Sequence, residues 1–231
     1  AETDFVARNT EFQEFALQTA KVALIDGAEV EKLLIAPYPG AEHSVSDELI
    51  NMIGKIGENI VVRRSEILGV DQGIVAGYLH NSVTPNVGKI GVLVGLESVG
   101  DEKSLKEFGH KLAMHICAAR PVSIDKDSVD PTLIEREKAV LREQAQGAGK
   151  SSEIVEKMVE GRLNKFFKEV ILQEQVYVID GESIVKKVIE SFEKELGTSV
   201  KISGFIRFEL GEGVEKKDED FAAEVAAQIK P

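Results

Sequence analysis

Hydrophobic residues recur at helical spacing over much of the chain and at every second position in a few shorter runs. The first helical pattern begins near residue 10, where Thr10 and Gln13 stand at the spacing of a capping box. A second amphipathic helix follows Ser46 and stops at Gly57, and an extended run then begins at Ile60. The first helix is predicted to have one apolar face, which carries Phe12, Phe15, Ala16, Ala20 and Ala23.

Alternating residues predict a β-hairpin over residues 74–97. Its first strand is expected over 73–81, its turn over 82–86 and its second strand over 89–97. In the second strand, large aliphatic residues alternate with Gly91, Leu93 and Gly95, and the small residues favour close packing of a helix on that face. A helix predicted over 102–119, which ends at Arg120-Pro121, is available for this packing.

Residues 125–172 have a different pattern, with two helices that are rich in charge. The first follows Asp130-Pro131 and extends to about Gln146, and the second begins after the glycines at 147 and 149 with Ser151-Ser152 as its cap. Two long helices joined by a tight turn predict an antiparallel helical hairpin. Because neither helix has enough apolar surface for a core of its own, we expect the hairpin to project from the body and meet a partner.

The last third of the chain returns to mixed structure. A strand is predicted over 176–179, a helix from Ile184 to Leu196, and a long strand over 200–210 with a bulge at Ser203-Gly204. A final helix over 221–229 has a narrow apolar stripe and is expected to dock on another surface. That stripe consists of Phe221, Ala222, Val225 and Ile229.

Together these elements predict an α+β fold. We expect two α/β core subdomains with antiparallel sheets and flanking helices, plus an inserted antiparallel helical hairpin and a C-terminal helix. The predicted boundaries are 1–70 for the helical part of the first core subdomain, 71–124 for the rest of it, 125–172 for the hairpin, 173–213 for the second core subdomain and 214–231 for the C-terminal docking helix.

Composition narrows the class of partner. The net charge of −12, from 28 basic and 40 acidic side chains, argues against a surface that follows nucleic-acid phosphates. The single cysteine, Cys117, excludes an internal disulfide and fits a reducing compartment. No apolar run approaches the ~20 residues of a membrane span. We therefore expect a cytoplasmic protein that binds another protein, with no direct nucleic-acid or membrane contact.

Candidate catalytic chemistry is sparse. The run GAGKS at 147–151 resembles a phosphate loop, but Gln144 stands where that motif needs glycine, and a helix precedes it where a strand is required. His110 and His115 are five residues apart on one helix, so they cannot share a metal ion. No nucleophile has a base partner. We expect no enzyme activity, no metal and no cofactor.

The amino-terminal run TDFVA is the most informative motif of the chain. Phe5 lies outside the apolar stripe of the helix that follows, and Asp4 stands beside it. In one interpretation Phe5 anchors a strand end to the core; in the other it is an exposed wedge offered to another protein, oriented by Asp4. His115 falls beside the apolar stripe of its helix, so it is expected to be half-buried at the edge of the core.

TDFVA and six further blocks resemble elongation factor Ts, the family of nucleotide exchange factors for EF-Tu, and they occur in the family's order. The blocks are KIGENIVVRR (55–64), GKIGVLVGLE (88–97), AMHICAARP (113–121), KMVEGRLNKFFKE (157–169), GFIRFELGEG (204–213) and FAAEVAA (221–227). The small helical module that usually opens the family is missing before TDFVA, as is most of the strand that leads into it. We therefore expect a shortened chain or an unusual parent protein.

The resemblance implies a function and a set of contacts. Thr3, Asp4, Phe5 and Val6 would bind the G domain of EF-Tu and disturb its Mg²⁺ site, and His115 of the AMH motif would contact the same partner. Phe221 and Val225 are further candidate contacts. The hairpin would dimerise, as in some members, or contact EF-Tu, as in others. A bacterial cytoplasmic location follows, with an organellar homologue left open. The alternative function is an acidic scaffold without exchange activity that dimerises through residues 125–172.

Overall fold

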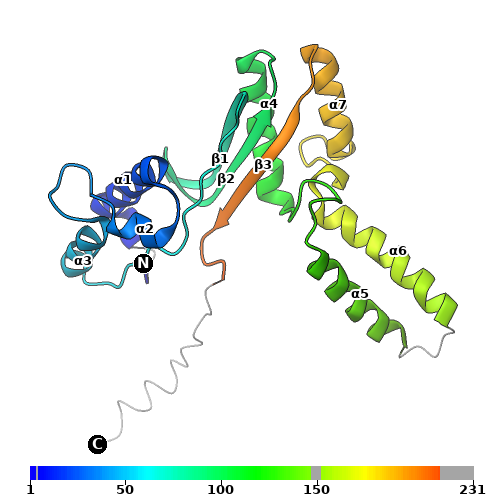
Figure 1. Ribbon diagram of the computed structural model, residues 1–231, viewed down its shortest axis with the longest axis horizontal. Coiled ribbons are helices and arrows are strands. Elements are labelled where there is room, and N and C mark those ends of the chain that lie inside the picture. The colour runs from blue at the N-terminus through cyan, green and yellow to red at the C-terminus, as the bar shows by residue number, and fades with distance from the viewer. Residues whose placement is uncertain (4, 147–151, 214–231) are drawn as a thin grey trace, which may run out of the picture.

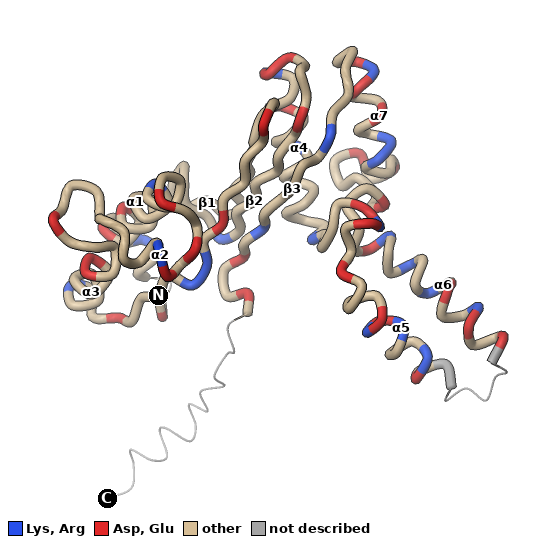
Figure 2. The backbone as a smooth tube through the Cα atoms, viewed as in Figure 1, with Lys and Arg blue, Asp and Glu red and all other residues tan. Residues whose placement is uncertain are grey.

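The computed structural model describes residues 1–3, 5–146 and 152–213 (Figure 1). They form a helical part at the amino end, a three-stranded sheet with helices on one face, and a helical hairpin that projects from it. The α+β class is confirmed. The predicted C-terminal helix over 221–229 lies outside the described residues. Acidic residues are spread over all three parts of the described chain (Figure 2), in keeping with the net charge.

The helical part has its own small core. It consists of a short 3₁₀ turn, η1 (Val6–Arg8), followed by α1 (Thr10–Asp26), α2 (Val30–Ile35) and α3 (Val45–Ile56). The helix predicted near residue 10 is confirmed, but its cap is Asn9, whose side chain accepts hydrogen bonds from the backbone N–H groups of Glu11 and Phe12. The core buries residues from every element of this part, namely Val6, Phe15, Val22, Ala23, Leu33, Ala36, Val45, Met52 and Ile60.

The sheet joins strands from distant parts of the chain. β1 (Gly73–Thr84), β2 (Val87–Glu97) and β3 (Lys201–Glu209) are antiparallel in the order β1-β2-β3. The expectation of separate sheets in two subdomains is therefore wrong for the described residues, because β3 extends the first hairpin. The predicted bulge is confirmed: Gly95 pairs with Gly204 and Leu96 with Ile202, so Ser203 is the extra residue. The strand predicted over 176–179 is wrong, because Val176 forms only an isolated bridge with Ile184.

One face of the sheet carries the main core. α4 (Glu102–Ala119) packs on the face of Val92, Val94 and Leu96, and α7 (Val185–Leu196) joins the same core. The rings of Phe108 and Phe192 stack there, with centroids 4.1 Å apart. The expectation that the helix would use the glycine face is therefore wrong, since burial of the large aliphatic side chains yields more free energy than close backbone approach.

The close approach is made by a glycine of the helix. A Cβ added to Gly109 of α4 would lie 2.6 Å from the Cβ of Ala76 in β1. We therefore predict that Gly109→Ala lowers the free energy of unfolding by roughly 1–3 kcal/mol through overpacking. Gly54→Ala in α3 is the matched control: nothing lies within 4 Å of its added Cβ, so helix propensity should raise stability by roughly 0.5–1 kcal/mol. Urea denaturation measures both, and equal effects of the two variants would contradict the packing argument.

The helical hairpin is confirmed. α5 (Pro131–Gln146) and α6 (Ser152–Val170) lie side by side and project from the sheet region (Figure 1). Asp130 begins α5 as expected, since its carboxylate accepts a hydrogen bond from the backbone N–H of Thr132 at 2.8 Å. The described core between the two helices is thin and consists of Leu141, Val155 and Val159. A second 3₁₀ turn, η2 (Leu172–Glu174), connects the hairpin to α7.

Candidate partner-binding site

Phe5 lies on the surface of the helical part. Its side chain is 83% exposed, which is unusual for a large aromatic residue in an ordered turn. Its backbone begins η1, where its carbonyl accepts a hydrogen bond from the N–H of Arg8 at 3.1 Å. The interpretation of Phe5 as a core anchor is therefore wrong, and the exposed position meets the requirement of the wedge interpretation.

Residues on both sides hold this turn in place. Val6, the next residue, is only 4% exposed and packs in the helical core. Thr3 donates a hydrogen bond from its backbone N–H to Glu58 at 3.0 Å, and its hydroxyl bonds to the other oxygen of the same carboxylate. Asp4 lies outside the described residues. The chain is therefore fixed at Thr3 and at Val6, and the ring between them faces solvent.

His115 has a different environment from the one expected. Its side chain is completely buried, whereas the helix pattern placed it at the edge of the core. The ring Nδ1 accepts a hydrogen bond from the backbone N–H of Val178 at 3.2 Å, so the proton resides on Nε2, which lies 3.0 Å from the side-chain oxygen of Gln175. Burial lowers the pKa of His115 below its usual value, and the hydrogen bond to Gln175 opposes this only in part.

Gln175 extends this buried network to two helix ends. Its side-chain nitrogen donates to the carbonyl oxygens of Ala119, at the end of α4, and of Glu169, near the end of α6. His115 and Gln175 therefore connect α4, the base of the hairpin and the segment 175–178. This network could not be predicted from residue patterns, because the segment that covers His115 is irregular.

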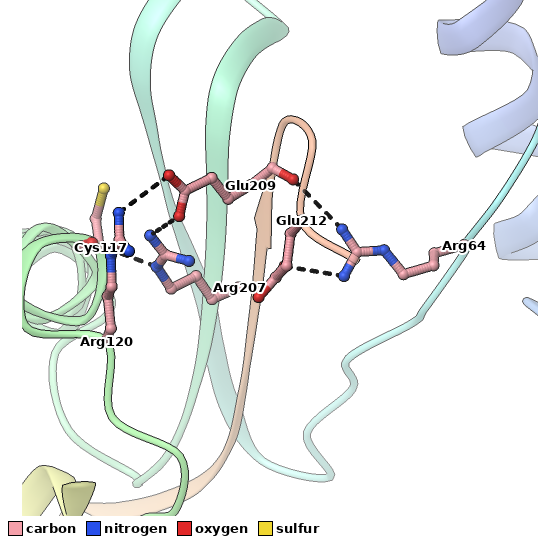
Figure 3. A network of polar contacts seen from close by, with 6 residues as sticks. All are labelled: Arg64, Cys117, Arg120, Arg207, Glu209 and Glu212. Atoms are coloured by element: carbon pink, nitrogen blue, oxygen red, sulfur yellow. Dashed lines mark hydrogen bonds and ion pairs between the residues drawn. The ribbon is translucent and has the colours of Figure 1, made fainter. Parts of the chain in front are cut away.

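A second polar network fixes the end of β3 (Figure 3). Arg207 donates to the carbonyl oxygen of Cys117 and pairs with Glu209 at 2.7 Å, and Arg120 binds the other oxygen of Glu209 at 3.0 Å. Beyond the strand, Arg64 binds the carboxylate of Glu212 at 2.9 Å, which lowers the pKa of that carboxyl group. The end of β3 is thereby tied both to α4 and to the segment that follows the helical part.

Candidate metal ligands and nucleophiles are sparse among the described residues. No group of three or more His, Cys, Asp or Glu side chains among them is arranged to hold a metal ion. Burial raises the pKa of the Cys117 thiol, which favours its inert, protonated form. The GAGKS run at 147–151 lies outside the described residues. None of the described helices combines the length and apolar content that crossing a bilayer demands.

Fold and site together define an α+β protein with an exposed phenylalanine on a turn near its amino end. The family model for elongation factor Ts matches residues 2–212. Elongation factor Ts of Rhodospirillum centenum is 53% identical over 98% of this chain and 74% of its own length, and that of Rhodospirillum rubrum is 50% identical over 100% and 75%. The chain therefore belongs to the elongation factor Ts family, the nucleotide exchange factors of translation elongation.

The comparisons bear on one further expectation. The family match begins at residue 2, and the relative from Paramagnetospirillum magneticum is 52% identical over 99% of this chain and 73% of its own length. The chain thus spans about three quarters of the length of these relatives. The expectation that it lacks the family's amino-terminal helical module gains no support from these matches.

Proposed function

We propose that this chain promotes GDP release from EF-Tu by inserting Phe5 between helices of the EF-Tu G domain. The observation that carries the proposal is the 83% exposure of a phenylalanine on a turn that is fixed at both sides. Insertion shifts the partner's helices, disturbs its Mg²⁺ site and phosphate loop, and weakens the hold on GDP. Thr3, Asp4 and Val6 complete the element; because Val6 is buried, it acts by holding the turn.

The energy available from one ring is limited. An aromatic hot spot contributes ~2–4 kcal/mol to an interface. If half of that energy opposes bound nucleotide, the affinity for GDP falls by roughly five- to thirtyfold. A larger effect requires further contacts, which we assign to Phe221 and Val225 of the C-terminal segment, outside the described residues. The coupling is reciprocal, so GDP weakens the affinity of this chain for EF-Tu by the same factor.

We assign to His115 an indirect part in partner binding. Its buried ring holds the backbone of Val178, and the neighbouring apolar side chains are exposed. Val176, Val178 and Ile179 are 53%, 44% and 45% exposed, respectively, and form an apolar surface next to the hairpin base. His115 would therefore support a contact with EF-Tu from beneath this surface.

The hairpin is proposed as a further protein contact. Val140 of α5 and Ile154 of α6 are 42% and 49% exposed, although the described core between these helices is thin. The occupant is a second copy of the chain, through residues 125–172, or EF-Tu. We propose a bacterial cytoplasmic location for both contacts, in keeping with the bacterial relatives, and no direct role for nucleic acid, membrane or cofactor.

The test of the proposed function uses the chain with EF-Tu that carries a fluorescent GDP. We predict that the chain accelerates nucleotide release in stopped-flow measurements and co-migrates with EF-Tu in size-exclusion chromatography. The chain alone, run on the same column with light-scattering detection, shows whether the hairpin binds a second copy. A dimer that neither accelerates release nor co-migrates with EF-Tu would instead support the scaffold function.

A further inference from the structure

An apolar groove of about 350 Å³ lies between the helical part and the end of β3. Phe12, Ala16 and Ala20 of α1 form one wall, and Phe208 and Leu210 form the opposite one. The hydroxyl of Thr19, which also lines the groove, is buried and has no hydrogen-bond partner among the described residues. Leu210 and Ala20 are exposed, so the groove is open to a ligand from outside. The volume is within the range of sites that bind small groups or single side chains.

Two arginines stand at the rim of the groove, together with Glu209, whose carboxylate is already paired with Arg120 and Arg207. Arg63 and Arg64 both line it and both are exposed at the residue level. Arg64 binds the carboxylate of Glu212 and lies over the ring of Phe208, 4.3 Å from its centroid. Arg63 donates one hydrogen bond, to the carbonyl oxygen of Glu212. Because a guanidinium has five N–H donors, both arginines retain donors for an acidic ligand.

The chain itself supplies a matching occupant. Gly211 lines the groove, and the described residues end two positions later at Gly213. Residues 214–220 connect this point to Phe221, and an extended chain gains about 3.3–3.6 Å per residue, so Phe221 can reach any part of the groove. Three acidic residues, Asp218, Glu219 and Asp220, precede Phe221. The next segment therefore presents an acidic run and then an apolar stripe, in the order that a basic rim and an apolar groove require.

We propose that this groove is the docking site of residues 218–229 of the same chain. Phe221 and Val225 pack against the apolar lining of the groove, and the acidic run at 218–220 faces Arg63 and Arg64. The docking itself follows from the groove and the sequence. Its consequence depends on the proposed function: because Phe221 and Val225 are the side chains assigned to EF-Tu, docking within the chain and binding of EF-Tu exclude each other.

Photo-crosslinking of the full chain tests the proposal without EF-Tu, so its result is independent of exchange activity. A benzoylphenylalanine in place of Phe221 is compared with one in place of Ala223, because the helical spacing predicted from the sequence puts positions 221 and 223 on opposite sides. An equal mixture of ¹⁵N-labelled and unlabelled chains separates crosslinks within one chain from those between chains. We expect peptides containing residues 12–20 or 60–65 to be crosslinked from position 221, within one chain, and not from position 223.

Two substitutions outside residues 218–229 test whether the crosslinking from position 221 depends on the groove. Ala20→Glu places a charge in the groove at an exposed position, and Arg63→Glu reverses the charge of the rim. Each is expected to reduce the crosslinking from position 221 while leaving the thermal midpoint close to that of the parent. Crosslinks between differently labelled chains, equal yields from positions 221 and 223, or yields unaffected by both substitutions would overturn the proposal.

Discussion

Replacing Phe5 by alanine is expected to slow the release of GDP from EF-Tu by roughly five- to thirtyfold, which corresponds to ~1–2 kcal/mol of lost coupling. The fold should be unaffected, because the side chain is 83% exposed and the turn is held by Val6 and Thr3. Stopped-flow release of a fluorescent GDP from EF-Tu measures the effect directly.

The matched control is Ile25→Ala at the end of α1. Ile25 is 82% exposed, so the substitution removes a similar amount of exposed apolar surface at a position outside the contact element. It should leave the release rate unchanged. Thermal melting of both variants within error of the parent confirms that stability is not the cause. A GDP release rate with Phe5→Ala equal to that with the parent chain would contradict the wedge mechanism.

The Phe5→Ala variant also tests the reciprocal coupling between GDP and this chain on EF-Tu. Thermodynamic linkage requires that the substitution change the affinity of this chain for GDP-bound EF-Tu less than its affinity for nucleotide-free EF-Tu, because the ring acts against the bound nucleotide. A uniform loss of affinity for both forms would mean that Phe5 is an ordinary interface residue.

Elements with strong local signals could be predicted from the sequence. The helix over 102–119 is α4 as observed, and the glycines that end α3 and α7 both have the left-handed backbone conformation expected of a helix stop, with φ of 77° at Gly57 and 76° at Gly197. The bulge at Ser203 was also predicted. In each case residues within a few positions determine the geometry.

Features that depend on distant residues could not be predicted. The pairing of β3 with β2 joins positions about a hundred residues apart, and nothing in either strand specifies its partner. The six-residue α2 is too short for a periodic pattern to identify it. The sequence predicts Thr10 as the cap of α1 from its spacing to Gln13, whereas the observed hydrogen bonds place the cap at Asn9.

The residues of the candidate site also divide into those that local sequence predicts and those that depend on distant residues. Phe5 was recognised because it falls outside the stripe of the neighbouring helix, which is a local property. The burial of His115 was missed because the covering segment, 175–178, lies sixty residues away and has no regular structure. Arg207 could not be identified from the sequence either. Its position fits the alternating pattern of its strand, but that pattern does not show that its guanidinium binds Glu209 and the carbonyl oxygen of Cys117, near the end of α4.

His115 carries the prediction with the largest expected effect on stability. Replacement by leucine leaves the partly buried backbone N–H of Val178 and the buried side-chain oxygen of Gln175 without their observed partner. At about 1–3 kcal/mol for each unsatisfied group, the free energy of unfolding should fall by roughly 2–6 kcal/mol. The control is His110→Leu on the same helix, since His110 is exposed and makes one hydrogen bond, to the carbonyl of Gly77. Urea denaturation at pH 7.5 (about one unit above the usual histidine pKa) compares the two.

The pH dependence separates this role from simple packing. Because burial lowers the pKa of His115 in the folded chain, the unfolded chain binds the proton more readily at pH values below its ordinary pKa of 6.5. The stabilisation is therefore fully present above pH 6.5 and is lost as the pH falls below it. The parent chain should lose stability over this window more steeply than His115→Leu, whereas His110→Leu should follow the parent. If the free energy of unfolding of the parent and of His115→Leu depended on pH in the same way, the ring would contribute only by packing between α4 and the base of the hairpin.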